Sequence, residues 1–246
     1  MPARPALPLL VFLALLALSL LLRWGTSFIS VINHDESTYI VIADALRNGA
    51  VYLRDVIDTK PIGIFWLYAG MEWVTGGSIV GLRLLTTAVV ALTAFLLFLT
   101  ARRPFGSDAM GWAAGLAYPC LCSLYTYYGI SPNTELFFNA FTVAAVAVAV
   151  APRVGPAGRP AFWQWPVAGV LLGAAAVIKP FVAADALAFG QRACTTNPII
   201  GDGANQGKGL LLVVELRCAN VNAQMAALGS GSKTVKDGVF HEGLKE

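Results

Sequence analysis

Charged side chains are scarce in this sequence. Asp, Glu, Lys and Arg together make up 13% of the 246 residues, whereas 57% of the residues are hydrophobic. The charged share is roughly half of that found in soluble globular proteins. The mean hydropathy is +0.67. These values exclude an ordinary soluble domain and indicate an integral membrane protein.

Basic clusters and metal-binding patterns are lacking as well. The formal net charge is only +3, and the Arg residues are scattered between apolar runs, which argues against a nucleic-acid partner. None of the cysteines has a zinc-type spacing to His34 or His241. We therefore expect free, buried thiols at all four positions, which are Cys120, Cys122, Cys194 and Cys218.

Long apolar runs are what the sequence does contain. Residues 7–22 carry no charge, and residues 28–32 extend this run to about the 20 residues that cross a bilayer. No signal-peptidase site of the Ala-x-Ala kind follows, so we expect an uncleaved anchor. Further spans are predicted at 79–101, 109–128, 136–151 and 164–187, which gives about five.

The apolar stretch 61–75 is too short to be a further span. It contains Glu72, and a crossing helix needs about 17 to 25 residues. We predict an interfacial helix here, with Trp66, Tyr68 and Trp73 at headgroup depth. This assignment places five arginines on one side of the membrane, as the positive-inside rule requires. They are Arg4, Arg102, Arg103, Arg153 and Arg159.

A second helix is predicted in the outer loop, residues 33–78. Apolar residues recur with helical spacing at Tyr39, Ile42, Ala43 and Leu46. Ser37 and Thr38 are the predicted caps at its start, and Gly49 is its predicted end. Such an amphipathic helix lies flat on a bilayer.

Two carboxylates, Asp35 and Glu36, come just before the predicted first turn of this helix. They either complement the helix dipole, which is worth about 0.3 to 1 kcal/mol, or they take part in chemistry. The stretch "YLRDVIDTKPIG" adds further acids and bases at the same membrane surface. These are Arg54, Asp55, Asp58 and Lys60. A solvated charged face explains any one of these residues, but explains the whole arrangement poorly.

Five segments, taken in order and with their spacing, resemble one enzyme family. They are "HDESTYIVIADALRNG", "YLRDVIDTKPIGIFWL", "GLRLLTTAVVALTAFLLFLTARRPFG", "SPNTELFFNAFTVAA" and "GVLLGAAAVIKP". Together they resemble the N-terminal half of the bacterial family-39 membrane glycosyltransferases, which include the protein O-mannosyltransferases and the aminoarabinose transferases acting on lipid A. The resemblance covers residues 7–182. It implies the GT-C fold, an all-α, polytopic membrane helical bundle with amphipathic interfacial helices in the first outer loop.

The resemblance also implies a reaction. These enzymes move a sugar from a polyprenyl-phosphate donor to a hydroxyl or phosphate acceptor on the outer face, with inversion at the anomeric carbon. Asp35 matches the acidic residue that follows the first span, and its implied role is to orient or deprotonate the acceptor. Glu36 is implied to assist, or to bind a divalent cation together with Asp35 if one is used.

Positive charge is needed where the lipid phosphate departs. Lys60 of the Lys-Pro pair is the best match to the family's donor-phosphate residue, and would stabilise the leaving group electrostatically. Arg54 is a second candidate. A lysine in this position can instead extend its ammonium group to lipid headgroups, which remains the alternative for Lys60.

Three more residues match the family near the outer ends of later spans. Asn133 and Glu135 belong to "SPNTE" and are candidates for facing Asp35 across an outer cavity. Helix capping by Ser131 or Asn133, with Glu135 in the first turn, accounts for the same letters. Lys179 precedes Pro180, and an ionisable residue at that depth favours function, although an end position also lets it reach the headgroups.

The resemblance stops after residue 182, and the composition changes with it. We predict a GT-C-like transmembrane domain at 1–187 and a polar, Gly-rich tail at 188–246. The tail motif "GDGANQGKG" is not a P-loop, since Asp202 replaces the first required Gly and Gly209 replaces the Ser/Thr. Family members are usually longer, so a truncated or frame-shifted product with an unrelated tail is one expectation.

The sequence therefore predicts a polyprenyl-phosphate-sugar-dependent glycosyltransferase. Its expected location is the bacterial inner (plasma) membrane, with several spans and a cytoplasmic N-terminus. Its expected partners are a lipid-linked sugar donor and a lipid or protein acceptor, with no nucleic acid. The alternative is a non-catalytic membrane fragment or scaffold. A transporter is disfavoured, because the charges gather in an outer loop and not at a midplane site.

Overall fold

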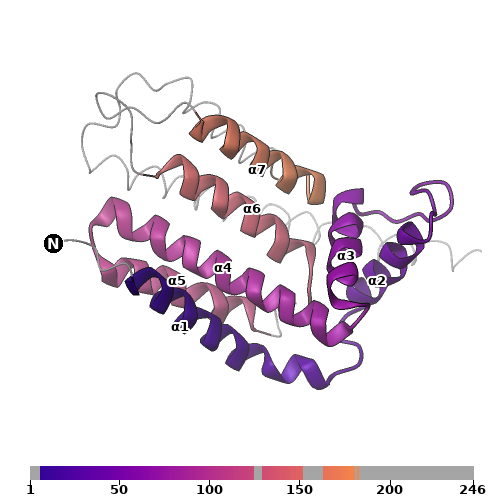
Figure 1. The fold of residues 1–246 in the computed structure, drawn as a ribbon, viewed down its shortest axis with the longest axis horizontal. Coiled ribbons are helices and arrows are strands. Elements are labelled where there is room, and N and C mark those ends of the chain that lie inside the picture. Colours follow the sequence, from indigo (N-terminus) through magenta and orange to yellow (C-terminus); the bar gives the residue numbers. More distant parts are fainter. Residues whose placement is uncertain (1–5, 125–128, 152–162, 181, 183–246) are drawn as a thin grey trace, which may run out of the picture. The chain divides into compact units, whose positions relative to one another are not determined.

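The computed structural model describes residues 6–124, 129–151, 163–180 and 182. They all belong to the first of two units of the chain, Met1–Cys194. Every regular element in this described part is helical, which confirms the all-α prediction (Figure 1). The isolated bridge between Tyr52 and Val56 lies in a loop. The predicted tail at 188–246 lies outside the described residues.

The described residues contain seven α-helices and one 3-10 helix, which loops connect. They are α1 (Ala6–Arg23), η1 (Trp24–Phe28), α2 (His34–Arg47), α3 (Ile62–Thr75), α4 (Ile79–Phe105), α5 (Asp108–Cys122), α6 (Thr134–Ala149) and α7 (Gln164–Ile178).

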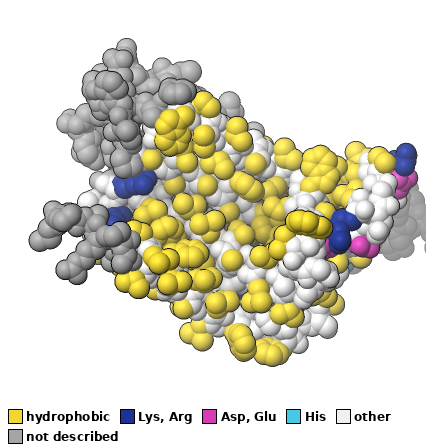
Figure 2. Space-filling model, in the orientation of Figure 1, with side chains coloured by type: hydrophobic (Ala, Val, Ile, Leu, Met, Phe, Trp, Pro, Cys, Tyr) yellow, Lys and Arg dark blue, Asp and Glu magenta, His cyan; other side chains and the backbone are white. Residues whose placement is uncertain are grey.

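Five of these helices, α1, α4, α5, α6 and α7, form a bundle (Figure 1). The long helix α4 is central, because it contacts α1, α5 and α6, and α7 packs on α6. Hydrophobic side chains cover most of the face shown in Figure 2, and the charged ones lie toward its ends. The segments Pro8–Phe28 and Ile79–Arg103 are long and apolar enough to cross a membrane, and α6 and α7 are shorter apolar helices. The fold is an all-α membrane helical bundle.

Small residues let α5 lie close to α4. A Cβ atom added at Gly111 would come within 3.0 Å of the Phe98 ring, and one at Gly115 within 3.2 Å of the Phe98 Cβ. Phe98 belongs to a buried cluster with Val11 and Leu15 of α1. Helices α1, α4 and α5 therefore pack together around Phe98.

Helices α2 and α3 pack against each other at one end of the bundle (Figure 1). Their shared core contains Tyr39, Phe65 and Tyr68, and it continues into the bundle through Phe137 and Ile178. The separate short helix predicted at 61–75 is confirmed as α3, which has 14 residues.

The predicted placement of one aromatic residue on α3 is wrong. Trp66 and Trp73 are 61% and 78% exposed, as an interfacial helix requires, but Tyr68 is fully buried. Its hydroxyl donates a hydrogen bond to the carbonyl oxygen of Pro132 at 2.5 Å. Tyr68 therefore fastens α3 to the segment that leads into α6.

Helix α2 begins earlier than predicted. Its N-cap is Asn33, whose side chain accepts a hydrogen bond from the backbone N–H of Asp35 at 3.2 Å. Asp35 and Glu36 therefore lie within the first turn, and the predicted capping by Ser37 and Thr38 is wrong. The helix ends at Arg47, close to Gly49, whose φ of +91° suits a glycine.

Other predictions about the chain are met in part. Cys120 and Cys122 are free, but Cys120 is exposed and Cys122 partly exposed, so the expectation of burial is wrong for these two. Residues 125–128, 181 and 183–187 of the predicted spans lie outside the described residues. So do Cys194, Cys218 and the arginines at 4, 153 and 159.

Candidate functional site

An ion pair joins Asp35 in the first turn of α2 to Lys60 just before α3. The Asp35 Oδ2 and Lys60 Nζ atoms are 3.7 Å apart, and the two side chains are 44% and 39% exposed. An ion pair this exposed contributes about 0 to 1 kcal/mol to stability. Breaking this ion pair therefore costs little stability when either side chain moves to contact a ligand.

A second lysine–carboxylate pair joins the first turn of α6 to the end of α7. The Lys179 ammonium group contacts Glu135 Oε1. It also lies 5.6 Å from the centroid of the Phe138 ring, within the range of a cation–π contact. The structure thus brings together two residues, 44 positions apart, that the sequence assigned separately to an outer cavity.

Tyr39 lies one helical turn after Asp35 on α2 and interacts with its carboxylate. Burial raises the pKa of its phenol, and so do the negative charges of Asp35, Glu135 and Asp58 and a hydrogen bond to Asp35. The phenol therefore stays protonated and can donate to the Asp35 carboxylate. The Tyr39 hydroxyl is therefore part of the surroundings of Asp35.

Glu36 is engaged differently from Asp35. It forms a bidentate ion pair with Arg83 of α4. Arg83 Nε donates to Oε1 at 2.8 Å, and Arg83 Nη2 donates to Oε2 at 2.9 Å. Both side chains are 2% exposed. Arg83 also donates to backbone carbonyl oxygens of η1 and of the segment that follows it, those of Thr26, Ile29 and Ser30. This arrangement ties the turn that carries Asp35 to α4.

Arg54 lies on an exposed loop away from these pairs. Its side chain is 70% exposed and pairs with the neighbouring Asp55, with Nη2 and Oδ2 at 2.8 Å. Asn133 occupies the N-cap position of α6 without a side-chain capping bond. The Ser131 hydroxyl instead donates to Asn133 Oδ1 at 3.3 Å.

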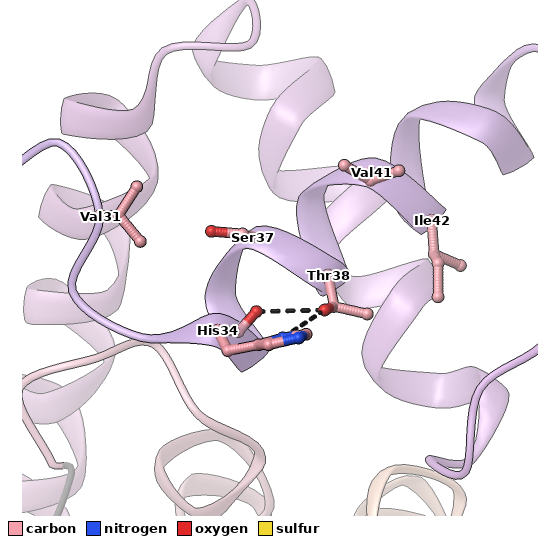
Figure 3. Close-up of a pocket in the computed structure, with 6 residues that line it drawn as sticks. All are labelled: Val31, His34, Ser37, Thr38, Val41 and Ile42. Carbon is pink, nitrogen blue, oxygen red and sulfur yellow. Dashed lines mark hydrogen bonds between the residues drawn. The ribbon is translucent and has the colours of Figure 1, made fainter.

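An open, mainly apolar recess lies along α2 (Figure 3). His34 and Thr38 point toward each other there, with Nδ1 and Oγ1 at 3.0 Å. The recess is lined by Val31, His34, Ser37, Thr38, Val41 and Ile42. It borders the helical turn that carries Asp35.

The described residues give little support for a metal ion. No group of three His, Cys, Asp or Glu side chains within them is placed to hold one. Of the two predicted ligands, Glu36 already has both oxygens bonded to Arg83. The site residues therefore do not fit the divalent cation that the sequence left open, and no catalytic step is assigned to one.

Several residues of the site were missed in the sequence. Arg83 is the one charge within an otherwise apolar run, and an ionisable residue in such a run is a usable signal. Tyr39 counted only as an apolar position of an amphipathic helix. Asp58 was noted only as one of several charged residues near Lys60, and no pattern in the sequence indicated that Tyr52 contacts the Lys60 backbone.

The fold and the site define a class: an all-α membrane protein with two lysine–carboxylate pairs near its helix ends. The model of one family, described as dolichyl-phosphate-mannose-protein mannosyltransferase, matches residues 59–190. This match covers more than half of the 246 residues, so the chain belongs to that family. No curated protein and no solved structure matches the chain.

The family match confirms the resemblance to mannosyltransferase-type membrane glycosyltransferases. It supports a membrane glycosyltransferase with a lipid-linked sugar donor. The matched segment contains Lys60, Asn133, Glu135 and Lys179. It begins after Asp35, Glu36 and Arg54. The roles expected for those three residues therefore rest on their contacts in the structure and on the sequence resemblance.

Proposed function

We propose that this protein transfers a sugar from a polyprenyl-phosphate donor to an acceptor on the extracytoplasmic face of the bacterial inner membrane. The observation that carries the proposal is the exposed pair of Asp35 and Lys60, 3.7 Å apart although 25 residues separate them in the chain. Such a transfer needs a base on the acceptor side of the sugar and a cation on the phosphate side, so this weak, exposed pair separates when the substrate enters between the two side chains. The family match supports the lipid-linked donor.

Asp35 is the proposed base. It accepts the proton of the acceptor hydroxyl as the oxygen attacks the anomeric carbon from the side opposite the phosphate. The bond between the anomeric carbon and the phosphate oxygen breaks, and its electron pair leaves with the polyprenyl phosphate. Lys60 stabilises the negative charge that develops on that oxygen. The configuration at the anomeric carbon inverts.

The remaining residues of the site take supporting roles in this proposal. Lys179 is a second cation for the phosphate, and Arg54 is a peripheral one on its exposed loop. Glu135 and Asn133 border the acceptor side. Glu36 supports Asp35 by holding their shared helical turn on α4 through Arg83, at 2.8 and 2.9 Å.

A transfer assay tests this function. Membranes that contain the full chain are supplied with labelled polyprenyl-phosphate mannose and with lipid and protein acceptors. Transfer that depends on Lys60 is expected, and Lys60→Ala is the reference variant. If the unmutated chain transfers no sugar but still binds polyprenyl phosphate through Lys60, the non-catalytic scaffold replaces the enzyme as the proposed function.

A labelling experiment tests the proposed orientation, with about five spans and a cytoplasmic N-terminus. Single cysteines are introduced at Asn48 after α2 and at Gly106 after α4, in a background without the native cysteines. Both positions are exposed. We expect an impermeant thiol reagent to label the Asn48 position from outside and the Gly106 position only after the membrane is opened. Labelling of both from outside would refute the orientation.

A further inference from the structure

The backbone around Lys60 is held by contacts that the proposed reaction does not itself require. The Tyr52 hydroxyl is within hydrogen-bond reach of two carbonyl oxygens, that of Asp58 at 2.9 Å and that of Lys60. The backbone N–H of Lys60 donates to Asp58 Oδ1 at 2.8 Å. Pro61 follows, and a residue before proline is restricted to extended conformations. The backbone of Lys60 is therefore fixed on both sides, while its side chain stays 39% exposed.

Tyr52 is itself held by two arrangements. Its ring packs on the buried Phe65, with centroids 5.3 Å apart. Its loop closes on itself, because the Leu53 N–H donates to the Val56 carbonyl oxygen and the Val51 N–H donates to Asp55 Oδ2, both at 2.8 Å.

Leu53, the next residue, shows that this loop conformation is not a relaxed one. Its φ is +67°, and it is the single non-glycine residue with a positive φ among those that the structure describes. A residue with a Cβ atom adopts this region only when its surroundings enforce it. Strain of this kind gathers where a geometry serves function. Here the strained turn adjoins the tyrosine that reaches the Lys60 backbone.

We infer that Tyr52 is a positioning residue for the donor phosphate: its hydroxyl sets the backbone of Lys60 so that the ammonium group meets the phosphate beside Asp35. The inference rests on the proposed function, in which Lys60 binds that phosphate. Tyr52 itself touches backbone and Phe65, and acts only through Lys60. Because the donor site is set in advance, the phosphate meets a lysine whose main chain needs no further ordering on binding.

The test measures binding of polyprenyl phosphate, without a sugar, to the full chain in detergent. Tyr52→Phe removes the hydroxyl and keeps the ring on Phe65. We expect it to weaken binding by about 3-fold to 10-fold, the range that one lost hydrogen bond supports. Lys60→Ala is expected to weaken binding further. The double variant should bind like Lys60→Ala alone, because a residue that acts through Lys60 has no effect once Lys60 is gone.

Two further measurements separate positioning from a general loss of structure. Tyr118→Phe makes the same chemical change on α5, which packs on α1 and α4, and should leave binding unchanged. Added salt should weaken binding less in Tyr52→Phe than in the unmutated chain, because a displaced ammonium group contributes less charge attraction. A merely loosened fold would lower the unfolding temperature without changing the salt dependence.

Each outcome decides between the two proposals. If Lys60→Ala binds polyprenyl phosphate like the unmutated chain, the role of Lys60 in the proposed function is overturned, and the inference about Tyr52 with it. If Lys60→Ala weakens binding but Tyr52→Phe does not, only the inference about Tyr52 is overturned. Additive losses in the double variant would also overturn it, since they would show that Tyr52 acts independently of Lys60.

Discussion

Asp35→Asn is expected to lower sugar transfer by about 10² to 10⁴ and to leave the protein folded in the membrane. The rate factor is the usual worth of general-base assistance. The change is nearly isosteric, but an amide cannot accept the proton of the acceptor hydroxyl. Its structural cost is small, since a carboxylate in the first turn of a helix contributes about 0.3 to 1 kcal/mol. Transfer of labelled sugar and the amount of inserted protein are the two measurements.

The matched control is Asp44→Asn, which makes the same change on the exposed side of the same helix. It should transfer sugar at the unmutated rate. Binding of polyprenyl phosphate should persist in Asp35→Asn, because the ammonium group of Lys60 loses a partner 3.7 Å away and stays free for the phosphate. Full transfer by Asp35→Asn would show that Asp35 is not the base.

Much of the fold follows from local features of the sequence. The segments Pro8–Phe28 and Ile79–Arg103 follow from apolar runs that are long enough to cross a membrane. The shortness of the stretch 61–75 and its Glu72 predict the separate helix α3. The start of α2 could not be placed in the same way. Asparagine, serine and threonine are all favoured N-cap residues, so Asn33, Ser37 or Thr38 could each begin the helix. The apolar spacing of Tyr39 and Ile42 is compatible with each of these starts. The backbone of Asn33 is extended, and its side chain is the one that reaches the Asp35 N–H.

The contacts within the site could not be predicted from local features of the sequence. Asp35 and Lys60 were assigned from the resemblance, but their contact depends on how α2 and α3 pack. Tyr68 suited an interface by its chemistry, since tyrosine has an apolar ring and a polar tip. Its actual partner, Pro132, is 64 residues further along the chain. Partners this distant are fixed by tertiary packing alone, which no local pattern records.

The buried pair of Glu36 and Arg83 gives the largest expected effect on stability. Arg83→Leu should lower the free energy of unfolding by about 3 to 5 kcal/mol, the cost of leaving one partner of a buried ion pair alone. The Glu36 carboxylate would remain at 2% exposure without its partner. The carbonyl oxygens of Thr26 and Ile29 would lose their donor as well. Unfolding by a denaturing detergent measures the loss.

An exposed ion pair between the end of α4 and the start of α5 is the control for this prediction. Arg102 and Asp108 are 40% and 62% exposed, so Arg102→Leu should cost no more than about 1 kcal/mol. The double variant Glu36→Leu and Arg83→Leu should recover part of the lost stability, since an apolar pair often replaces a buried ion pair without cost. It should still transfer sugar poorly, because the turn that carries Asp35 is no longer tied to α4. If Arg83→Leu unfolds at the same detergent concentration as the unmutated chain, the ion pair does not hold α2 in place, and Glu36 returns as a candidate for direct contact with substrate.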